Sequence, residues 1–241
     1  MTIRDLSGKV EDLIRVKNVI ISVYHKEGLD MLAVGLIEEN PDVRFISSGG
    51  TYTALNKILG SSGEERLIEA SSYTGFPEMD GGLVKTLHPK IHGGILGERN
   101  NPKHQQYLSD LNGGVYIDLV VVDLYPFGSV VKKIERGEIN PQTGNPFNFE
   151  SARGNIDIGG PAMLRAGAKN FPSCAAISSV YDYSQFLFDL RKNKGNTDFK
   201  QRFNLAKKVF TTTSEYDSAI AVYLSAQDPN EVKDSYEFSE K

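Results

Sequence analysis

The stretch IDLVVVDLY, residues 117–125, is the strongest strand signal in the sequence. Its apolar residues run continuously, which is typical of a strand buried on both faces of a parallel sheet. Helical patterns separate it from other strand-like runs; in EGLDMLAVGLIEEN, residues 27–40, Leu29, Leu32 and Leu36 share one helical face. The other predicted strands are NVIISVY (18–24), VRFISS (43–48), RLIEA (66–70) and CAAISS (174–179). We therefore expect an α/β fold, a parallel five-stranded sheet with helices on both faces.

The C-terminal third of the sequence has a different character. Residues 181–192 and 198–224 have helical patterns, and we expect these helices to pack on the same domain. Residues 135–155 are rich in Pro, Gly and Asn, which predicts a long loop. The expected organisation is an N-terminal arm (1–14), one domain (15–227) and a flexible tail (228–241).

Composition narrows the class of protein. The 241 residues include 24% charged and 39% hydrophobic side chains, with a net charge of −4, so the sequence has neither a disordered composition nor the basic excess of a nucleic-acid-binding protein. The single cysteine, Cys174, cannot form an internal disulfide and lies in an apolar run. No apolar run approaches the roughly 20 residues that cross a bilayer. We expect a cytoplasmic enzyme or binding protein that binds neither nucleic acid nor membrane.

Three unusual segments should meet at the carboxyl ends of the strands, where open α/β sheets bind their ligands. They are SSGGT (47–51), DLYPF (123–127) and GFPEMDGGLVKTLHPKIHGGIL (75–96). The last of these has no helical or strand periodicity, so we expect a long loop that lines the ligand site.

Two glycine pairs could bind an anion. Ser48-Gly49-Gly50-Thr51 stands at a strand-to-helix turn, where free N–H groups and hydroxyls can form a phosphate site; the alternative is an ordinary capped helix. Gly159-Gly160 opens a second helix. Asp157, just before that pair, could cap the helix or direct its carboxylate into the same cleft.

Single residues in these segments also have two interpretations each. Lys85 could be partly desolvated for proton transfer, or a surface lysine. Lys169 is by default a solvated cation at a helix C-terminus, and Tyr125 is either a donor in the cleft or a residue at the sheet rim. His88 and His92 are four residues apart, but the motif lacks a glutamate and a third ligand, so we expect no metal site.

Several stretches together resemble one family. ISVYHKEGL (21–29), SSGGT, TGFPEMDGGLVKTLHPKIHGGIL (74–96), IDLVVVDLYPF (117–127) and NIDIGGPAMLRAGAKN (155–170) are similar to the IMP cyclohydrolase domain of the AICAR transformylase/IMP cyclohydrolase family. The resemblance extends through LAKKVF and YDSAIAVYL in the last predicted helix. It implies a methylglyoxal-synthase-like fold and closure of 5-formamidoimidazole-4-carboxamide ribotide to IMP, with loss of water and without a cofactor or metal. This is the last step of de novo purine biosynthesis.

The resemblance also assigns residues and partners. The catalytic positions fall on Lys85, Tyr125, Asp157 and Lys169. It implies a homodimer, and a separate formyltransferase to supply the substrate, because no transformylase region is present. The positions that bind substrate and phosphate fall on Ser22, Lys26, Ser48, Gly49, Gly50, Thr51, Thr86, Gly159 and Gly160.

Three positions depart from the family pattern. Leu83 stands where the pattern has arginine, His25 where it has aspartate, and Asp123 where it has asparagine. Leucine cannot replace a bidentate arginine, so an alternative is a non-catalytic, purine-nucleotide-binding regulatory or partner subunit. Phosphate elimination, as in methylglyoxal synthase, would share the fold, but the quoted segments match the cyclohydrolase instead.

Overall fold

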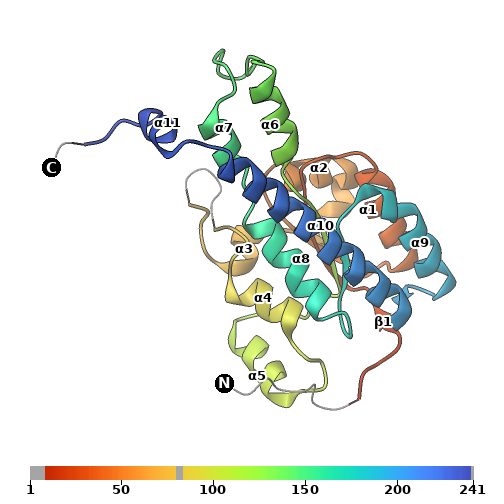
Figure 1. The fold of residues 1–241 in the computed structure, drawn as a ribbon. Coiled ribbons are helices and arrows are strands. Elements are labelled where there is room, and N and C mark those ends of the chain that lie inside the picture. The colour runs from red at the N-terminus through yellow and green to blue at the C-terminus, as the bar shows by residue number, and fades with distance from the viewer. Residues whose placement is uncertain (1–8, 80–83, 240–241) are drawn as a thin grey trace. The chain divides into compact units, whose positions relative to one another are not determined.

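The computed structural model describes residues 9–79 and 84–239 (Figure 1). Within them the main sheet has five strands, all parallel, in the order β4-β3-β2-β5-β6. The five predicted strands are these five, and the predicted fold class is confirmed. The strands are β2 (Asn18–Val23), β3 (Arg44–Ser47), β4 (Leu67–Glu69), β5 (Leu119–Asp123) and β6 (Ala175–Ile177); a separate pair joins β1 (Ile14–Arg15) to β7 (Asn196–Thr197).

The register brings the carboxyl ends of three strands to one edge of the sheet. On β2, Ile21 pairs with Ser47 of β3, and Val23 pairs with Asp123 of β5. The segments that follow these strands therefore begin side by side, because neighbouring strands of a sheet lie about 4.8 Å apart.

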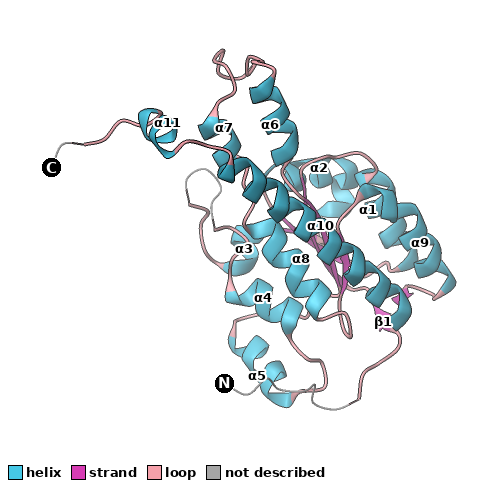
Figure 2. Ribbon diagram, viewed as in Figure 1, coloured by secondary structure: helices cyan, strands magenta, loops and turns pink. Residues whose placement is uncertain are grey.

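The chain forms two compact units, 1–124 with 159–210 and 125–158 with 211–241. The long helix α10 passes from the first unit into the second, so α9 and the start of α10 belong to the sheet unit, whereas the rest of α10 and α11 do not. The helices (Figure 2) are α1 (Leu29–Glu39), α2 (Gly49–Leu59), α3 (Ala70–Thr74), α4 (Pro89–Leu96), α5 (Pro102–Asp110), α6 (Phe127–Glu135), α7 (Phe149–Gly154), α8 (Gly159–Lys169), α9 (Tyr183–Lys192), α10 (Phe199–Ser225) and α11 (Pro229–Asp234), with 3₁₀ turns at Gly60–Gly63 and Val180–Asp182.

Two loop predictions are wrong in part, because short helices lie inside them. In the segment 75–96, His88 accepts the backbone N–H of Lys90 at 3.0 Å and starts α4. In the segment 135–155, Asn148 and Ser151 form a capping box that starts α7. The segment predicted as a tail contains α11, which is capped by Asp228. Helices of six to eight residues are too short to show periodicity, so only the cap residue announces them.

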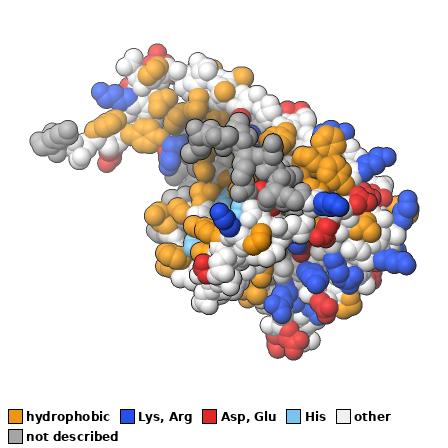
Figure 3. Space-filling view, turned by 90° about the horizontal axis from the view of Figure 1, so that it is seen from below, with side chains coloured by type: hydrophobic (Ala, Val, Ile, Leu, Met, Phe, Trp, Pro, Cys, Tyr) orange, Lys and Arg blue, Asp and Glu red, His pale blue; other side chains and the backbone are white. Residues whose placement is uncertain are grey.

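The surface carries both signs of charge. On the face drawn in Figure 3, lysine and arginine side chains are interspersed with aspartate and glutamate. This mixture matches the small net charge of the sequence and differs from the continuous basic surface that binds nucleic acid.

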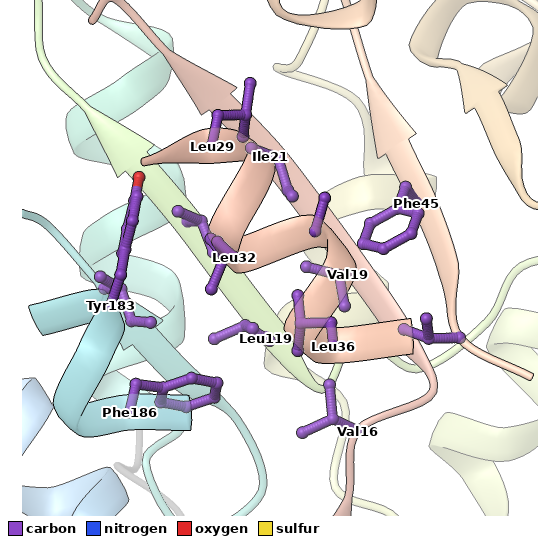
Figure 4. Close-up of a cluster of buried hydrophobic side chains, with 14 of the residues drawn as sticks. Val16, Val19, Ile21, Leu29, Leu32, Leu36, Phe45, Leu119, Tyr183 and Phe186 are labelled. Carbon is purple, nitrogen blue, oxygen red and sulfur yellow. The ribbon is translucent and has the colours of Figure 1, made fainter. Parts of the chain in front are cut away.

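The core of the first unit lies on both faces of the sheet. On one face, Leu32 and Leu36 of α1 and Phe186 of α9 pack over the central strands (Figure 4). On the other face, Gly167 of α8 lies so close to the sheet that a Cβ there would be 3.1 Å from Ala176. The layers therefore have helices on both sides of the sheet, as predicted.

A buried arginine connects distant segments of the first unit. Arg202 of α10 is fully buried, and its guanidinium donates to the carbonyls of Phe171 (2.9 Å), Asp12 (2.9 Å) and Thr197 (2.6 Å). It also donates to Glu11 and Pro172. Burial lowers the pKa of Arg202 to about 10. One side chain thus joins the N-terminal segment, β7 and the segment before β6 to α10.

We expect Arg202→Met to lower the free energy of unfolding by about 3–5 kcal/mol, because it leaves several buried carbonyls without donors. Arg191→Met is the matched control: Arg191 is exposed and pairs with Glu38 and Glu39 at the surface, so it should cost about 1 kcal/mol or less. Urea unfolding of both variants measures the difference, and equal losses would show that the Arg202 network contributes little.

Candidate functional site

Helix α2 begins with a buried hydroxyl at the carboxyl edge of the sheet. Ser48 is its N-cap residue, yet its side chain makes no capping hydrogen bond. Ser48 is only 4% exposed, and its Oγ has no hydrogen-bond partner among the residues that the structure describes. Buried polar groups are rarely left without a partner. A hydroxyl of this kind beside free helix N–H groups is a ready partner for an anion.

Lys85 lies against the same turn. Gly49 has φ +52°, and a Cβ built on it would be 3.0 Å from Nζ of Lys85. Gly50, the next residue, has open space on that side. The structure therefore brings together three predicted site features: the Ser48 hydroxyl, the glycine turn and a lysine ammonium.

Residues 84–86 also reach the start of α8. Thr86 is buried, and its Oγ1 lies 2.6 Å from where a Cβ on Gly159 would stand, so only glycine allows this approach. Val84 has φ +65°, which is a strained conformation for a β-branched residue. The segment thus connects the N-termini of α2 and α8 at the expense of backbone strain. Leu83, the predicted departure from arginine, lies outside the described residues.

Three further predicted residues lie around the end of β2: Lys26 in the turn that follows it, Thr51 in α2 and Ser22 on the strand itself. Nζ of Lys26 donates to the carbonyls of Val23 and Tyr24, and burial lowers the pKa of Lys26. Oγ1 of Thr51 donates to the Val23 carbonyl at 2.9 Å and accepts the Val23 N–H at 3.1 Å, so this hydroxyl joins α2 to β2. Ser22, which precedes Val23 on β2, is half-buried.

His25 and Asp123, two departures from the family pattern, contact each other. Oδ2 of Asp123 accepts the backbone N–H of His25 at 2.9 Å and lies 2.7 Å from its ring Nδ1. Both positions stand out in the sequence as departures, but their pairing does not. Contact between residues almost a hundred positions apart depends on parallel strand pairing, which leaves no local signal in the sequence.

Tyr125 and Asp157 belong to the second unit, where a tyrosine of α10 supports the segment before α8. The backbone N–H of Asp157 donates to the hydroxyl of Tyr216 at 2.8 Å, and that hydroxyl donates to the Asn155 carbonyl at 2.9 Å. Burial raises the pKa of Tyr216 to about 12. Tyr125 is exposed at the end of β5. The supporting role of Tyr216 was not predicted, because its bonds join residues about sixty positions apart and leave no local signal in the sequence.

Lys169 is not brought to the glycine turns. It is exposed in the last turn of α8, ten residues after Gly159, which is about 15 Å along the helix axis. This position agrees with the default interpretation of a solvated cation at a helix C-terminus. A catalytic role for Lys169 stays a prediction without support from this arrangement.

The two histidines of the 75–96 segment have local roles. His88 caps α4, and the ring of His92 hydrogen-bonds the backbone of Thr86 while burial lowers the pKa of His92. Among the described residues, no three His, Cys, Asp or Glu side chains are grouped to hold a metal ion. In the same part of the chain, no helix has both the length and the apolar character needed to cross a membrane.

Comparison with known proteins finds relatives described as bifunctional purine biosynthesis proteins. The chain is 43% identical over 214 residues to the bifunctional purine biosynthesis protein PurH of Magnetococcus marinus, covering 89% of this chain and 37% of that protein. It is 44% identical over 216 residues to PurH of Chlorobium phaeobacteroides, covering 90% and 38%. The chain therefore spans little more than a third of the length of these relatives.

Two further comparisons agree. A family model described as AICARFT/IMPCHase bienzyme matches residues 167–241. The crystal structure of ForH superposes with a TM-score of 0.64 at 29% sequence identity, covering 85% of this chain and 97% of that one. The resemblance inferred from the sequence motifs is confirmed.

We expect Ser48→Ala to separate stability from anion binding. Removing a buried hydroxyl without a partner should leave the melting temperature unchanged or higher. Loss of a charge-assisted hydrogen bond should weaken binding of inorganic phosphate by about tenfold. Differential scanning calorimetry measures the melting temperature, and isothermal titration calorimetry measures the phosphate affinity. A clear loss of stability would show that the hydroxyl has an internal partner.

We expect Gly49→Ala to displace Lys85 and to weaken phosphate binding several-fold. This loss should exceed the effect of backbone strain alone. Gly60→Ala is the matched control, because Gly60 has nearly the same φ of +53° but open space around its Cβ position. Both variants place alanine at a positive φ, which costs on the order of 1–3 kcal/mol. Equal phosphate affinity in the two variants would argue against a role for the Lys85 contact.

Proposed function

We propose that the chain is an IMP cyclohydrolase, because it is similar over almost nine-tenths of its length to bifunctional purine biosynthesis proteins PurH and matches the AICARFT/IMPCHase bienzyme model over residues 167–241. The reaction closes 5-formamidoimidazole-4-carboxamide ribotide to IMP. The carboxamide nitrogen attacks the formyl carbon, and water is lost.

The observation that supports it best is the anion site at the start of α2. A ribotide carries a phosphate, and the Ser48 hydroxyl, the glycine turn and Lys85 provide donors and positive charge for it. Lys26, whose ammonium lies at the end of the neighbouring strand β2, adds a second cation to this edge. The 84–86 segment extends the surface to the N-terminus of α8.

Most of the rate enhancement would come from positioning. Both reacting groups belong to one substrate, so holding them in the attack geometry lowers the barrier without a cofactor. The remaining tasks are to move a proton from the carboxamide nitrogen and to stabilise the oxyanion on the formyl oxygen. Lys85 lies at the glycine turn, so phosphate binding and proton transfer at the formyl group are its two candidate roles. The resemblance implies Tyr125 at the formyl group and Asp157 with Lys169 at the carboxamide. Gly159, Gly160 and Thr86 would complete the substrate surface. Ser22 and Thr51 would shape the β2 side of the site.

A non-catalytic nucleotide-binding subunit would use the same anion site, so binding alone does not separate the two functions. We further propose a homodimer, which the resemblance implies, and a cytoplasmic location, which the composition favours.

The test is ring closure itself. Purified chain mixed with the formylated ribotide should show the ultraviolet change of IMP formation well above the uncatalysed rate. Lys85→Ala should lower kcat by about 100-fold if Lys85 transfers a proton, or raise KM with little change in kcat if it binds only phosphate.

Lys57→Ala is the control, because Lys57 is an exposed lysine at the opposite end of α2. It should behave as the unmodified chain. Tight IMP binding without any closure would favour the binding subunit.

A further inference from the structure

A cavity of about 650 Å³ lies in the first unit, at the amino ends of β2 and β5. It is lined by Asn18, the first residue of β2, and by Asp118, which directly precedes β5. The candidate active site lies at the carboxyl ends of the same strands. Because β2 has six residues, about 17 Å of strand separates the two edges of the sheet. Figure 1 shows β1 and α5 at the lower end of this unit and α2 at its upper end. The cavity is therefore separate from the site described above.

Arg99 is held in the wall of this cavity by a buried carboxylate. Asp118 is only 2% exposed, and its Oδ2 accepts the backbone N–H groups of Lys17 and Asn18 at 2.7 Å each. The other oxygen, Oδ1, accepts a hydrogen bond from Nη2 of Arg99. The guanidinium also lies over the ring of Tyr116, 5.2 Å from its centroid. Both oxygens of the carboxylate are thus engaged, and the fold fixes the position of the arginine.

The wall of the cavity contains hydrogen-bond donors that lack acceptors. Nη2 of Arg99 also donates to the carbonyl of Ser173 at 3.3 Å, but neither Nη1 nor Nε donates to any residue that the structure describes. Nε is buried, and buried donors are rarely left without an acceptor. Gly113 and Gly114, in the loop after α5, line the same cavity, and their N–H groups make no hydrogen bond within the described part of the chain. A ligand rich in acceptors would match these groups.

The charged side chains around the cavity favour an anion. Arg15 and Lys17 line it from the N-terminal segment, and both are exposed to solvent. Glu11 opposes them with one negative charge. Because Arg99 and Asp118 form an ion pair with each other, two positive charges and one negative charge remain among the lining residues. Lysine and arginine bind carboxylates and phosphates, and arginine can do so with two parallel hydrogen bonds.

The volume of the cavity sets the size of its ligand. Pockets of about 300–1,000 Å³ hold small organic molecules, and Ile14 and Leu108 give this one an apolar part. We propose that the cavity binds a small organic anion, a phosphate monoester or a carboxylate, through Arg15, Lys17 and Arg99. This binding site is additional to the proposed active site and does not depend on the cyclohydrolase function.

The experiment titrates the isotope-labelled chain with ribose 5-phosphate and, separately, with citrate, and follows the backbone amide signals by NMR. Signals of Gly113 and Gly114 report on this cavity, whereas those of Gly49 and Gly50 report on the turn at the start of α2. We expect the first pair to shift in a saturable way with at least one of the two anions. The probe that binds distinguishes a phosphate monoester from a carboxylate as the ligand.

Three variants test the charges of the cavity. R15A/K17A should weaken the binding seen at Gly113 and Gly114 by about tenfold, because it removes two positive charges and leaves the backbone bonds in place. Glu11→Gln should tighten the binding about twofold to threefold, because it removes the opposing charge. K57A/K192A is the matched control with unchanged affinity: it removes two exposed lysines that do not line the cavity.

The outcomes separate this site from the anion site at α2. Weaker binding in R15A/K17A together with tighter binding in Glu11→Gln supports the cavity site. An equal loss of affinity in R15A/K17A and K57A/K192A overturns it, because the net charge of the chain would then be responsible. Shifts confined to Gly49 and Gly50, or no shifts with either anion, also overturn it. None of these results bears on ring closure, so the proposed function stands or falls by its own assay.

Discussion

Parallel pairing of β2 with β3 on one side and β5 on the other obliges the chain to return to the same sheet edge after every crossover. The turn at Ser48, the turn at His25 and the end of β5 at Asp123 therefore begin side by side, although long helical segments separate them in the sequence. Chemistry at this edge needs no special loop architecture, because the sheet has already gathered the segments. What the loops add is the identity of the side chains.

Much of the fold could be predicted because its signals are local. Short apolar runs marked every strand of the main sheet, and the spacing of Leu29, Leu32 and Leu36 marked α1. The short helices α4 and α7 were missed, because a helix of two turns has too few residues for periodicity. The site was predicted in part. Its turn and Lys85 were placed together, but the pairing of His25 with Asp123 and the support from Tyr216 depend on contacts between distant residues.

Two departures from the family pattern, at positions 25 and 123, are explained by a contact at this edge of the sheet. A carboxylate and an amide side chain can share a hydrogen bond, and so can an imidazole and a carboxylate. With histidine at position 25, a carboxylate at position 123 supplies the acceptor that the Nδ1 proton needs. The two changes are thus compatible as a pair, whereas either alone would alter the contact. Residues that look degenerate one at a time are better judged by what they touch.

Val84 places a β-branched residue in a left-handed conformation, and such strain costs on the order of 1–3 kcal/mol. Glycine at this position would adopt the same backbone conformation without strain, and a search for thermostable variants would select it. The same substitution would let the neighbouring lysine sample many orientations instead of one. At this position, selection for stability therefore favours glycine, whereas selection for activity favours the residue that holds the lysine in one orientation.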